Sequence, residues 1–226
     1  MNNVESEFND VKTKYPSLCL GINSDNGYVV SGYIGFTIRI KDLDIKDYFN
    51  IVINIPHDYP NTLPKTREID GRIPQYFHKY DNAILCLETP LEQRIIFNSQ
   101  PTLLGYIENC LIPYLVTFHY WTKTGDMPYG ERDHCGAGII QSYQARLNVK
   151  DPIAILGFLF MLSTNIFLRR QKCLCGSGER FCRCHETRII ELQPLQTKKE
   201  FEYEYGQVLN FLRAKKISVP EYFVIH

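Results

Sequence analysis

Several features that would narrow the function of this 226-residue chain are missing from its sequence. Its 25 Lys and Arg residues balance its 25 Asp and Glu residues, so the formal net charge is zero. A chain with no excess of basic residues does not bind polyanions over its whole surface, and any nucleic-acid surface must be local. The sequence has no internal repeat and no low-complexity segment, which excludes solenoid and tract-like architectures.

The sequence also lacks the apolar runs of secreted and membrane proteins. Its N-terminal residues have neither the basic nor the apolar region of a signal peptide. The long apolar stretch at 153–168 contains polar residues at 163–165 and is shorter than the roughly 20 residues that span a bilayer. We therefore expect a cytoplasmic protein with no membrane partner. The sequence is rich in cysteine, with eight residues that we expect to stay reduced in that compartment.

Hydrophobic spacing predicts an α+β fold. Helices are expected from about residue 4, from Pro101, from Asp151 as N-cap, and over about 198–213. The residues 28–40 predict one bent strand or a bulged hairpin, 49–55 predict a second strand, and 69–92 predict mostly loop with a short strand at 83–87. Pro113 is expected to kink the far end of the helix that starts at Pro101.

Half of the cysteines lie in one short segment, 173–185, whereas disulfide frameworks spread their cysteines along the chain. Two pairs of ligands separated by a glycine-containing turn suit tetrahedral zinc, and Gly176 and Gly178 are expected to adopt positive φ angles. We predict one structural zinc ion, with Cys182 as a spare thiol or as an alternative to Cys184. The predicted ligands are Cys173, Cys175, Cys184 and His185.

This segment resembles the SEC-C zinc motif, in which Cys-x-Cys-Gly-Ser-Gly is followed after five residues by Cys and then by Cys or His. Every patterned position is present at 173–185. The resemblance implies a small zinc-held appendage that contacts partners, and it leaves catalysis to the rest of the chain.

Cys86 ends an apolar run just before Pro90, a place where a cysteine is either buried or accessible and nucleophilic. The order of features around it is an N-terminal helix, a strand meander, Tyr59-Pro60 with Pro64, a loop, and then Cys86 before a helix. This order resembles the ubiquitin-conjugating-enzyme (UBC) family, whose catalytic cysteine has a similar Ile-Cys-Leu setting. The resemblance implies a UBC-like domain at 1–168, followed at 169–226 by the zinc knuckle and a terminal helix.

The family's His-Pro-Asn triplet, which precedes the catalytic cysteine, is replaced here by His78-Lys79-Tyr80. The same departure is common in bacterial relatives from antiphage operons. The resemblance implies that Cys86 accepts the C-terminal acyl group of a ubiquitin-like or other tagged protein. Asn82 and His78 are the candidates for stabilising the oxyanion, and side-chain capping of the loop is the alternative for both.

Downstream, the segment around His134 also resembles the bacterial subfamily, although Cys135 separates His134 from Gly136. His134 is a candidate for deprotonating the acceptor amine or for stabilising the loop that faces Cys86, and Cys135 is an alternative nucleophile. The resemblance implies an activating enzyme or a nucleotidyltransferase encoded nearby as partner. Two other functions stay open: a UBC-like binding module without catalysis, and a nucleic-acid adaptor that uses the basic residues around the knuckle, although nucleic acid is the partner we expect least.

Overall fold

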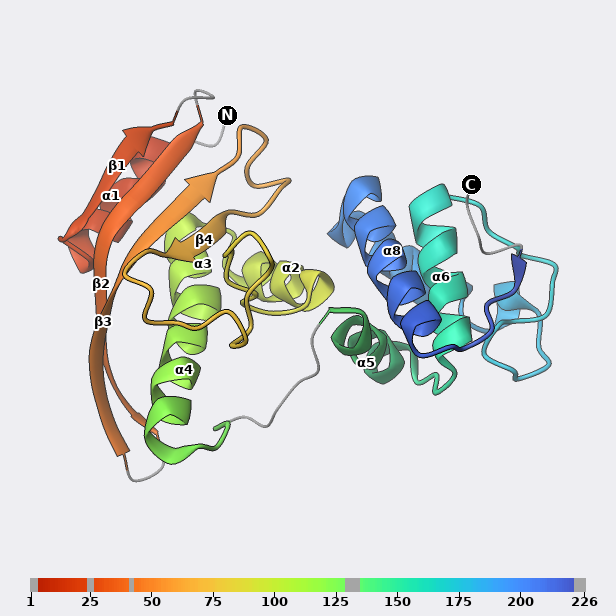
Figure 1. Cartoon of the computed structure of the whole chain (residues 1–226). Coiled ribbons are helices and arrows are strands. Elements are labelled where there is room, and N and C mark those ends of the chain that lie inside the picture. Colours follow the sequence, from red (N-terminus) through yellow and green to blue (C-terminus); the bar gives the residue numbers. More distant parts are fainter. Residues whose placement is uncertain (1–3, 24–26, 41–42, 129–134, 222–226) are drawn as a thin grey trace. The chain divides into compact units, whose positions relative to one another are not determined.

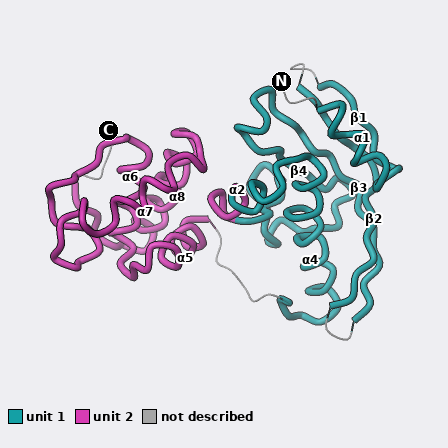
Figure 2. The backbone as a smooth tube through the Cα atoms, turned by 180° about the vertical axis from the view of Figure 1, so that it is seen from behind, with its two compact units in different colours: residues 1–88, 95–131 teal, residues 89–94, 132–226 magenta. Residues whose placement is uncertain are grey.

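A computed structural model describes residues 4–23, 27–40, 43–128 and 135–221 (Figure 1). Over these residues the chain has an α+β fold with an N-terminal helix, a four-stranded antiparallel sheet and seven further α-helices. The chain forms two compact units, residues 1–88 with 95–131 and residues 89–94 with 132–226 (Figure 2). The predicted α+β class is therefore confirmed. The units divide the chain differently from the two domains predicted at 1–168 and 169–226.

Unit 1 is built around an antiparallel meander in the order β1-β2-β3-β4. Alternate residues of β2 and β3, such as Ile34 and Phe49, face a core that also includes α1, α3 and α4. The elements are α1 (Val4–Lys14), β1 (Leu18–Ile22), β2 (Tyr28–Ile40), β3 (Leu43–Ile55), β4 (Lys65–Glu68), the second half of α2 (Pro90–Ser99), α3 (Leu103–Tyr106), the π-helical turn η1 (Ile107–Leu111) and α4 (Ile112–Thr124).

Several predictions for unit 1 are confirmed and others are wrong. The first helix forms as predicted, and residues 28–40 form one continuous strand. The expected strand at 83–87 is wrong, because this segment makes only a single β-bridge between Leu85 and Lys79. The expected start at Pro101 is also wrong, because Thr102 caps the helix by accepting a hydrogen bond from the Gly105 amide. Pro113 lies in the first turn of α4, where proline needs no amide donor, and not at its far end.

Unit 2 is helical. Its elements are the first half of α2, α5 (Cys135–Leu147), α6 (Pro152–Thr164), η2 (Phe181–Arg183), α7 (Glu186–Leu192), η3 (Gln193–Leu195) and α8 (Lys198–Ala214). The predicted N-cap of α6 is confirmed, because Asp151 accepts a hydrogen bond from the Ile153 amide at 2.9 Å. Gly136 lets α5 approach α8, since a Cβ there would lie 2.4 Å from that of Phe211.

The helix α6 is apolar on nearly all sides and is mostly buried within unit 2, as the sequence predicts for a core helix. No single helix among the described residues has the length and apolar composition of a membrane span, and α5 with α6 meets that measure only as a pair bent by 87°.

Candidate functional site

Cys86 lies at the end of a short hairpin that spans residues 78–86. The Cys86 amide donates to the His78 carbonyl at 2.7 Å, and the Tyr80 amide donates to the Ile84 carbonyl at 2.9 Å. The turn closes with a bond of 2.9 Å from the Ala83 amide to the Tyr80 carbonyl. The Leu85 amide also donates to the Thr66 carbonyl of β4 at 2.9 Å. These bonds satisfy backbone groups of the loop, and they place Cys86 opposite His78.

Tyr114 of α4 holds the first strand of the hairpin through hydrogen bonds. Its hydroxyl lies 3.0 Å from the Phe77 carbonyl and 3.2 Å from the His78 carbonyl, and both oxygens accept from it. Burial raises the pKa of Tyr114, and its nearness to the ionisable groups of Cys86 and Glu68 raises it further. This hydroxyl therefore stays protonated and fixes the strand opposite Cys86. The sequence marked Tyr114 only as part of an apolar helix face.

The Cys86 thiol is partly buried, and its Sγ lies 3.8 Å from the Glu88 carbonyl oxygen. Cys110 differs, because burial, followed by the charge of Glu88, raises its pKa to about 12. Cys110 therefore stays a neutral thiol in the core, while Cys86 keeps access to the surface. Cys19 is exposed on β1.

The two candidate oxyanion residues lie in the same hairpin as Cys86. Asn82 is in the turn, and its Oδ1 accepts from the Ile84 amide at 3.3 Å while its carbonyl accepts from Arg67. His78 adopts a positive φ of 42° and packs edge-on against the Phe77 ring. The side chain of Asn82 therefore caps the turn, and the His78 carbonyl pairs with the Cys86 amide.

The other candidate from the downstream segment, His134, lies outside the described residues. Cys135 is described and exposed at the first position of α5, with a φ of 51°.

The second site is the cluster of three cysteines and one histidine at the knuckle of unit 2. The ligand atoms of all four residues lie within 4.8 Å of one another, and the group could hold one metal ion such as zinc. Gly176 and Gly178 have φ angles of 79° and 80°, as predicted, and they turn the chain back between the two ligand pairs. The residues are Cys173, Cys175, Cys184 and His185.

The spacing of the donor atoms fits a tetrahedral ion. Zinc bonds of about 2.3 Å to sulfur and about 2.05 Å to nitrogen place tetrahedral ligands about 3.8 Å apart for two sulfurs and about 3.6 Å apart for sulfur and nitrogen. The Sγ atoms of Cys175 and Cys184 are 3.5 Å apart. Nδ1 of His185 is 3.3 Å from the Cys173 sulfur and 3.1 Å from the Cys184 sulfur. These separations are close to those of a tetrahedral zinc site, so the four predicted residues could together hold the ion.

A contact outside the cluster selects the ligand nitrogen of His185. Its Nε2 lies 3.0 Å from the Leu147 carbonyl oxygen, a contact that requires a proton on Nε2. Nδ1 is then unprotonated and faces the three sulfurs, which is the tautomer that a metal needs. Cys182 is outside the cluster, and its amide donates to the Arg169 carbonyl, so Cys184 and not Cys182 completes the group.

The basic residues around the knuckle divide into two kinds. Arg169 pairs with Glu186, and Arg188 donates to the Leu147 carbonyl at 3.0 Å, so both have structural roles. All six are exposed, and Lys172 and Arg180 are directly opposite each other in a β-bridge. The other four basic residues are Arg170, Lys172, Arg180 and Arg183.

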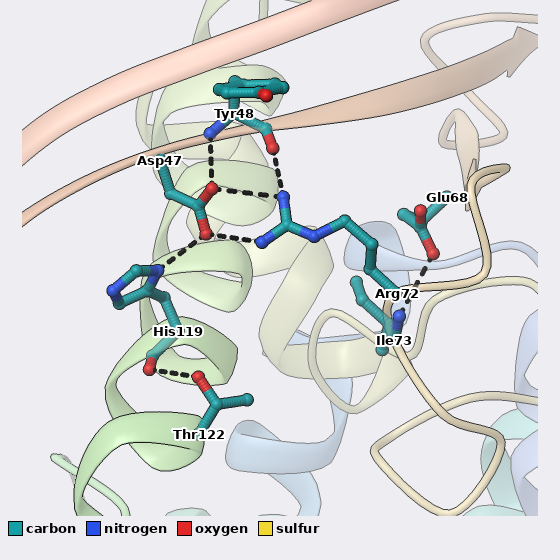
Figure 3. Close-up of polar contacts among 7 residues, drawn as sticks. All are labelled: Asp47, Tyr48, Glu68, Arg72, Ile73, His119 and Thr122. Carbon is teal, nitrogen blue, oxygen red and sulfur yellow. Dashed lines mark hydrogen bonds and ion pairs between the residues drawn. The ribbon is translucent and has the colours of Figure 1, made fainter.

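A third polar group, in unit 1, was missed by the sequence analysis (Figure 3). Asp47 of β3 accepts from Arg72 at 2.8 Å, and its Oδ2 lies 2.6 Å from Nδ1 of His119 on α4. Burial pushes the pKa of Asp47 upward, but hydrogen bonds from Arg72 and His119 outweigh it and hold the pKa below its ordinary value. The Arg72 guanidinium also lies 4.2 Å from the centre of the Phe49 ring. These residues tie together β3, a loop and α4, and no local sequence pattern links them.

Neither a comparison with protein-family models nor a search of curated proteins finds a match for this chain. Its function must therefore be inferred from the chemistry of its own residues.

Proposed function

We propose that the chain is a UBC-like thioester carrier in bacterial antiphage defence, with Cys86 as the acyl acceptor. The observation that carries the proposal is the place of Cys86: a partly buried thiol at the end of a hairpin, in the loop that follows an antiparallel meander and precedes the helix α2. That order is the one that the resemblance implies. The knuckle of unit 2 would hold one structural zinc ion, in line with the resemblance to the SEC-C motif.

The reaction takes place in two exchanges. The Cys86 thiolate attacks the acyl carbonyl of a ubiquitin-like or tagged protein that is activated as a thioester, and the donor's thiolate leaves as the new thioester forms. An amine then attacks the Cys86 thioester, an amide bond forms, and Cys86 leaves as thiolate while the amine's proton passes to a base or to water. A thiolate suits both exchanges because it is a good nucleophile and a good leaving group.

Asn82 remains the candidate for holding the oxyanion. Its Oδ1 is engaged in the turn, while its Nδ2 donates to no other group among the described residues. An amide donor of this kind is worth roughly 2.7–4 kcal/mol to an acyl transfer, which is about 100- to 1000-fold in rate. His78 stays the second candidate for holding the oxyanion. His134 stays the candidate for deprotonating the acceptor amine or for stabilising the loop that faces Cys86.

A short peptide with a C-terminal thioester tests the proposal without its natural partner. We expect the peptide to transfer to Cys86 as a reductant-labile adduct, and Cys86→Ser to give either no adduct or a reductant-resistant oxyester. Cys19→Ser is the matched control, because Cys19 is an exposed thiol on β1. Transfer that is no faster to Cys86 than to Cys19 would refute the carrier role.

One observation favours a second candidate, a UBC-like module that binds a ubiquitin-like protein without acyl transfer. Asn82 uses its side chain in the turn, which is the capping role that the sequence analysis kept as the alternative. The two candidates differ in the Asn82→Ala variant with the same peptide thioester. A carrier loses about 100-fold in transfer rate, whereas a binding module has no transfer to lose.

A further inference from the structure

The metal cluster is connected to α5 through one backbone carbonyl. Leu147 is the last residue of α5, and its carbonyl has no partner within the helix. His185 and Arg188 both lie 3.0 Å from this oxygen through side-chain nitrogens. The predicted metal ligand His185 thus also bonds to the C-terminal end of α5. Displacement of His185 removes that hydrogen bond.

Two residues that precede Leu147 on α5 contact the start of α2. The Ser142 hydroxyl lies 2.6 Å from Oε1 of Glu92, and Nε of Arg146 lies 2.7 Å from the same oxygen. The first half of α2 belongs to unit 2, so these contacts lie within one compact unit. They hold the first turn of α2 against the C-terminal half of α5.

The helix α8 holds the same turn from a buried position. Glu204 is fully buried, and it accepts from the Leu91 amide at 3.1 Å and from the Tyr143 hydroxyl at 2.6 Å. The Leu91 amide has no partner inside α2, so Glu204 supplies the hydrogen bond that the helix start lacks. Arg94, which is 5% exposed, pairs with Glu200 at 3.2 Å.

The turn that is held in this way begins at Pro90, and three residues separate it from Cys86. The Thr89 carbonyl accepts from the Gln93 amide at 2.9 Å, which makes Thr89 the residue before the helix. The preceding carbonyl, that of Glu88, is the one that the Cys86 thiol contacts at 3.8 Å. A covalent link of three residues therefore joins the held turn to the thiol.

We propose that the metal centre positions Cys86, because the knuckle fixes the end of α5, and α5 with α8 fixes the start of α2. Loss of the contact between His185 and Leu147 then loosens the first turn of α2 and the peptide groups between it and Cys86. This inference rests on the proposed function only in taking Cys86 as the reactive thiol. It connects the knuckle to Cys86 through contacts within unit 2 and through the covalent chain at residues 87–89.

The test keeps the metal and removes its contact with α5. His185→Cys leaves four thiols for zinc but deletes the bond to the Leu147 carbonyl, and Arg188→Leu deletes the other bond and leaves all four ligands in place. Amide exchange at residues 91–94 is measured together with the rate of Cys86 alkylation by iodoacetamide, in chains whose zinc content is confirmed as one ion. We expect the exchange to rise about tenfold, the effect of losing one buried hydrogen bond, and the alkylation rate to change with it.

The control is Glu202→Gln, because Glu202 is exposed on α8 and, among the residues that the structure describes, its ion pair is with Lys198. Unchanged exchange at residues 91–94 in both zinc-loaded variants would overturn the inference, as would faster exchange with an unchanged rate of Cys86 alkylation. A chain that accepts no peptide thioester but shows both changes would refute the carrier function and leave the positioning intact.

Discussion

The Cys86 hairpin and the knuckle at residues 173–185 both contain cysteine, but they place it in different surroundings. In the knuckle three thiols and an imidazole converge within 4.8 Å, and a carbonyl outside the cluster selects the nitrogen that faces them. In the hairpin a single thiol stands at the end of a backbone ladder and keeps partial access to solvent. The difference teaches that the number of convergent donors, more than the presence of cysteine, separates a metal site from a candidate nucleophile.

The strongest way to break this comparison is to remove a metal ligand. Cys184→Ala should lose the single bound zinc ion and lower the free energy of unfolding of unit 2 by several kcal/mol. A loss below the roughly 10–16 kcal/mol known for zinc-finger peptides is expected, since unit 2 has its own helical core. Metal analysis and thermal unfolding measure both effects. Cys182→Ser is the control, and loss of zinc from that variant would show that the ligand set is wrong.

The second effect concerns the buried acid that holds α2. Burial, partly offset by hydrogen bonds from Tyr143, raises the pKa of Glu204 from 4.5 to about 7. The folded chain then binds a proton more tightly than the unfolded chain between these values, so the free energy of unfolding falls as pH rises from 4.5 to 7 and levels off above it. The total change is about 3 kcal/mol, at 1.36 kcal/mol per pKa unit.

The Glu204→Gln variant has no titratable group at this position, so its stability should not depend on pH for this reason. Denaturant unfolding from pH 5 to 8, with zinc content held constant, should show a slope in the wild-type chain that the variant lacks. The charged groups around Glu204 are Glu200 on α8, Arg94 and Glu92 on α2, and Arg146 on α5, and all of them are present in both chains. Equal slopes in the two chains would show that Glu204 does not titrate in this range.

A smaller effect is expected from a substitution that loosens the Cys86 hairpin. Tyr114→Phe removes the hydroxyl that donates to the Phe77 and His78 carbonyls, and it should cost about 1–2 kcal/mol because buried acceptors lose a donor. The rate of Cys86 alkylation should rise as the hairpin loosens. Tyr76→Phe, at a side chain that is 76% exposed, is the control. If stability and the rate of Cys86 alkylation are unchanged in Tyr114→Phe, the hydrogen bonds from α4 do not hold the hairpin.

The group of three cysteines and one histidine was predicted from the sequence because its members are local. All four lie within 13 residues, and two glycines between them mark the turn. The ladder that holds Cys86 was not predicted, because its bonds depend on backbone groups whose pairing has no side-chain signature. The short strand β4, which reads Lys-Thr-Arg-Glu, was missed for a similar reason: it has no apolar alternation.

The contacts that depend on tertiary structure were also beyond the sequence. Glu204 meets the Leu91 amide across 113 positions of the chain, and Asp47 meets His119 across 72. The helix α5 was missed because its first residues include Gly136 and Gly138, which lower helix propensity but allow close packing. Local pattern therefore predicted the elements with strong periodicity and the metal knuckle, and long-range packing determined the rest.

The most direct test of the account is the alkylation of all eight cysteines in the native, zinc-loaded chain at pH 7, resolved by site with mass spectrometry. We predict that Cys86 reacts faster than the exposed Cys19, because the proposed acyl transfer and alkylation both use the thiolate, so a site built for the first also favours the second. The three knuckle cysteines should react only after a chelator is added, and Cys110 only after denaturant is added. The account is contradicted if Cys86 stays protected until denaturant is added, or if the knuckle cysteines react before chelation.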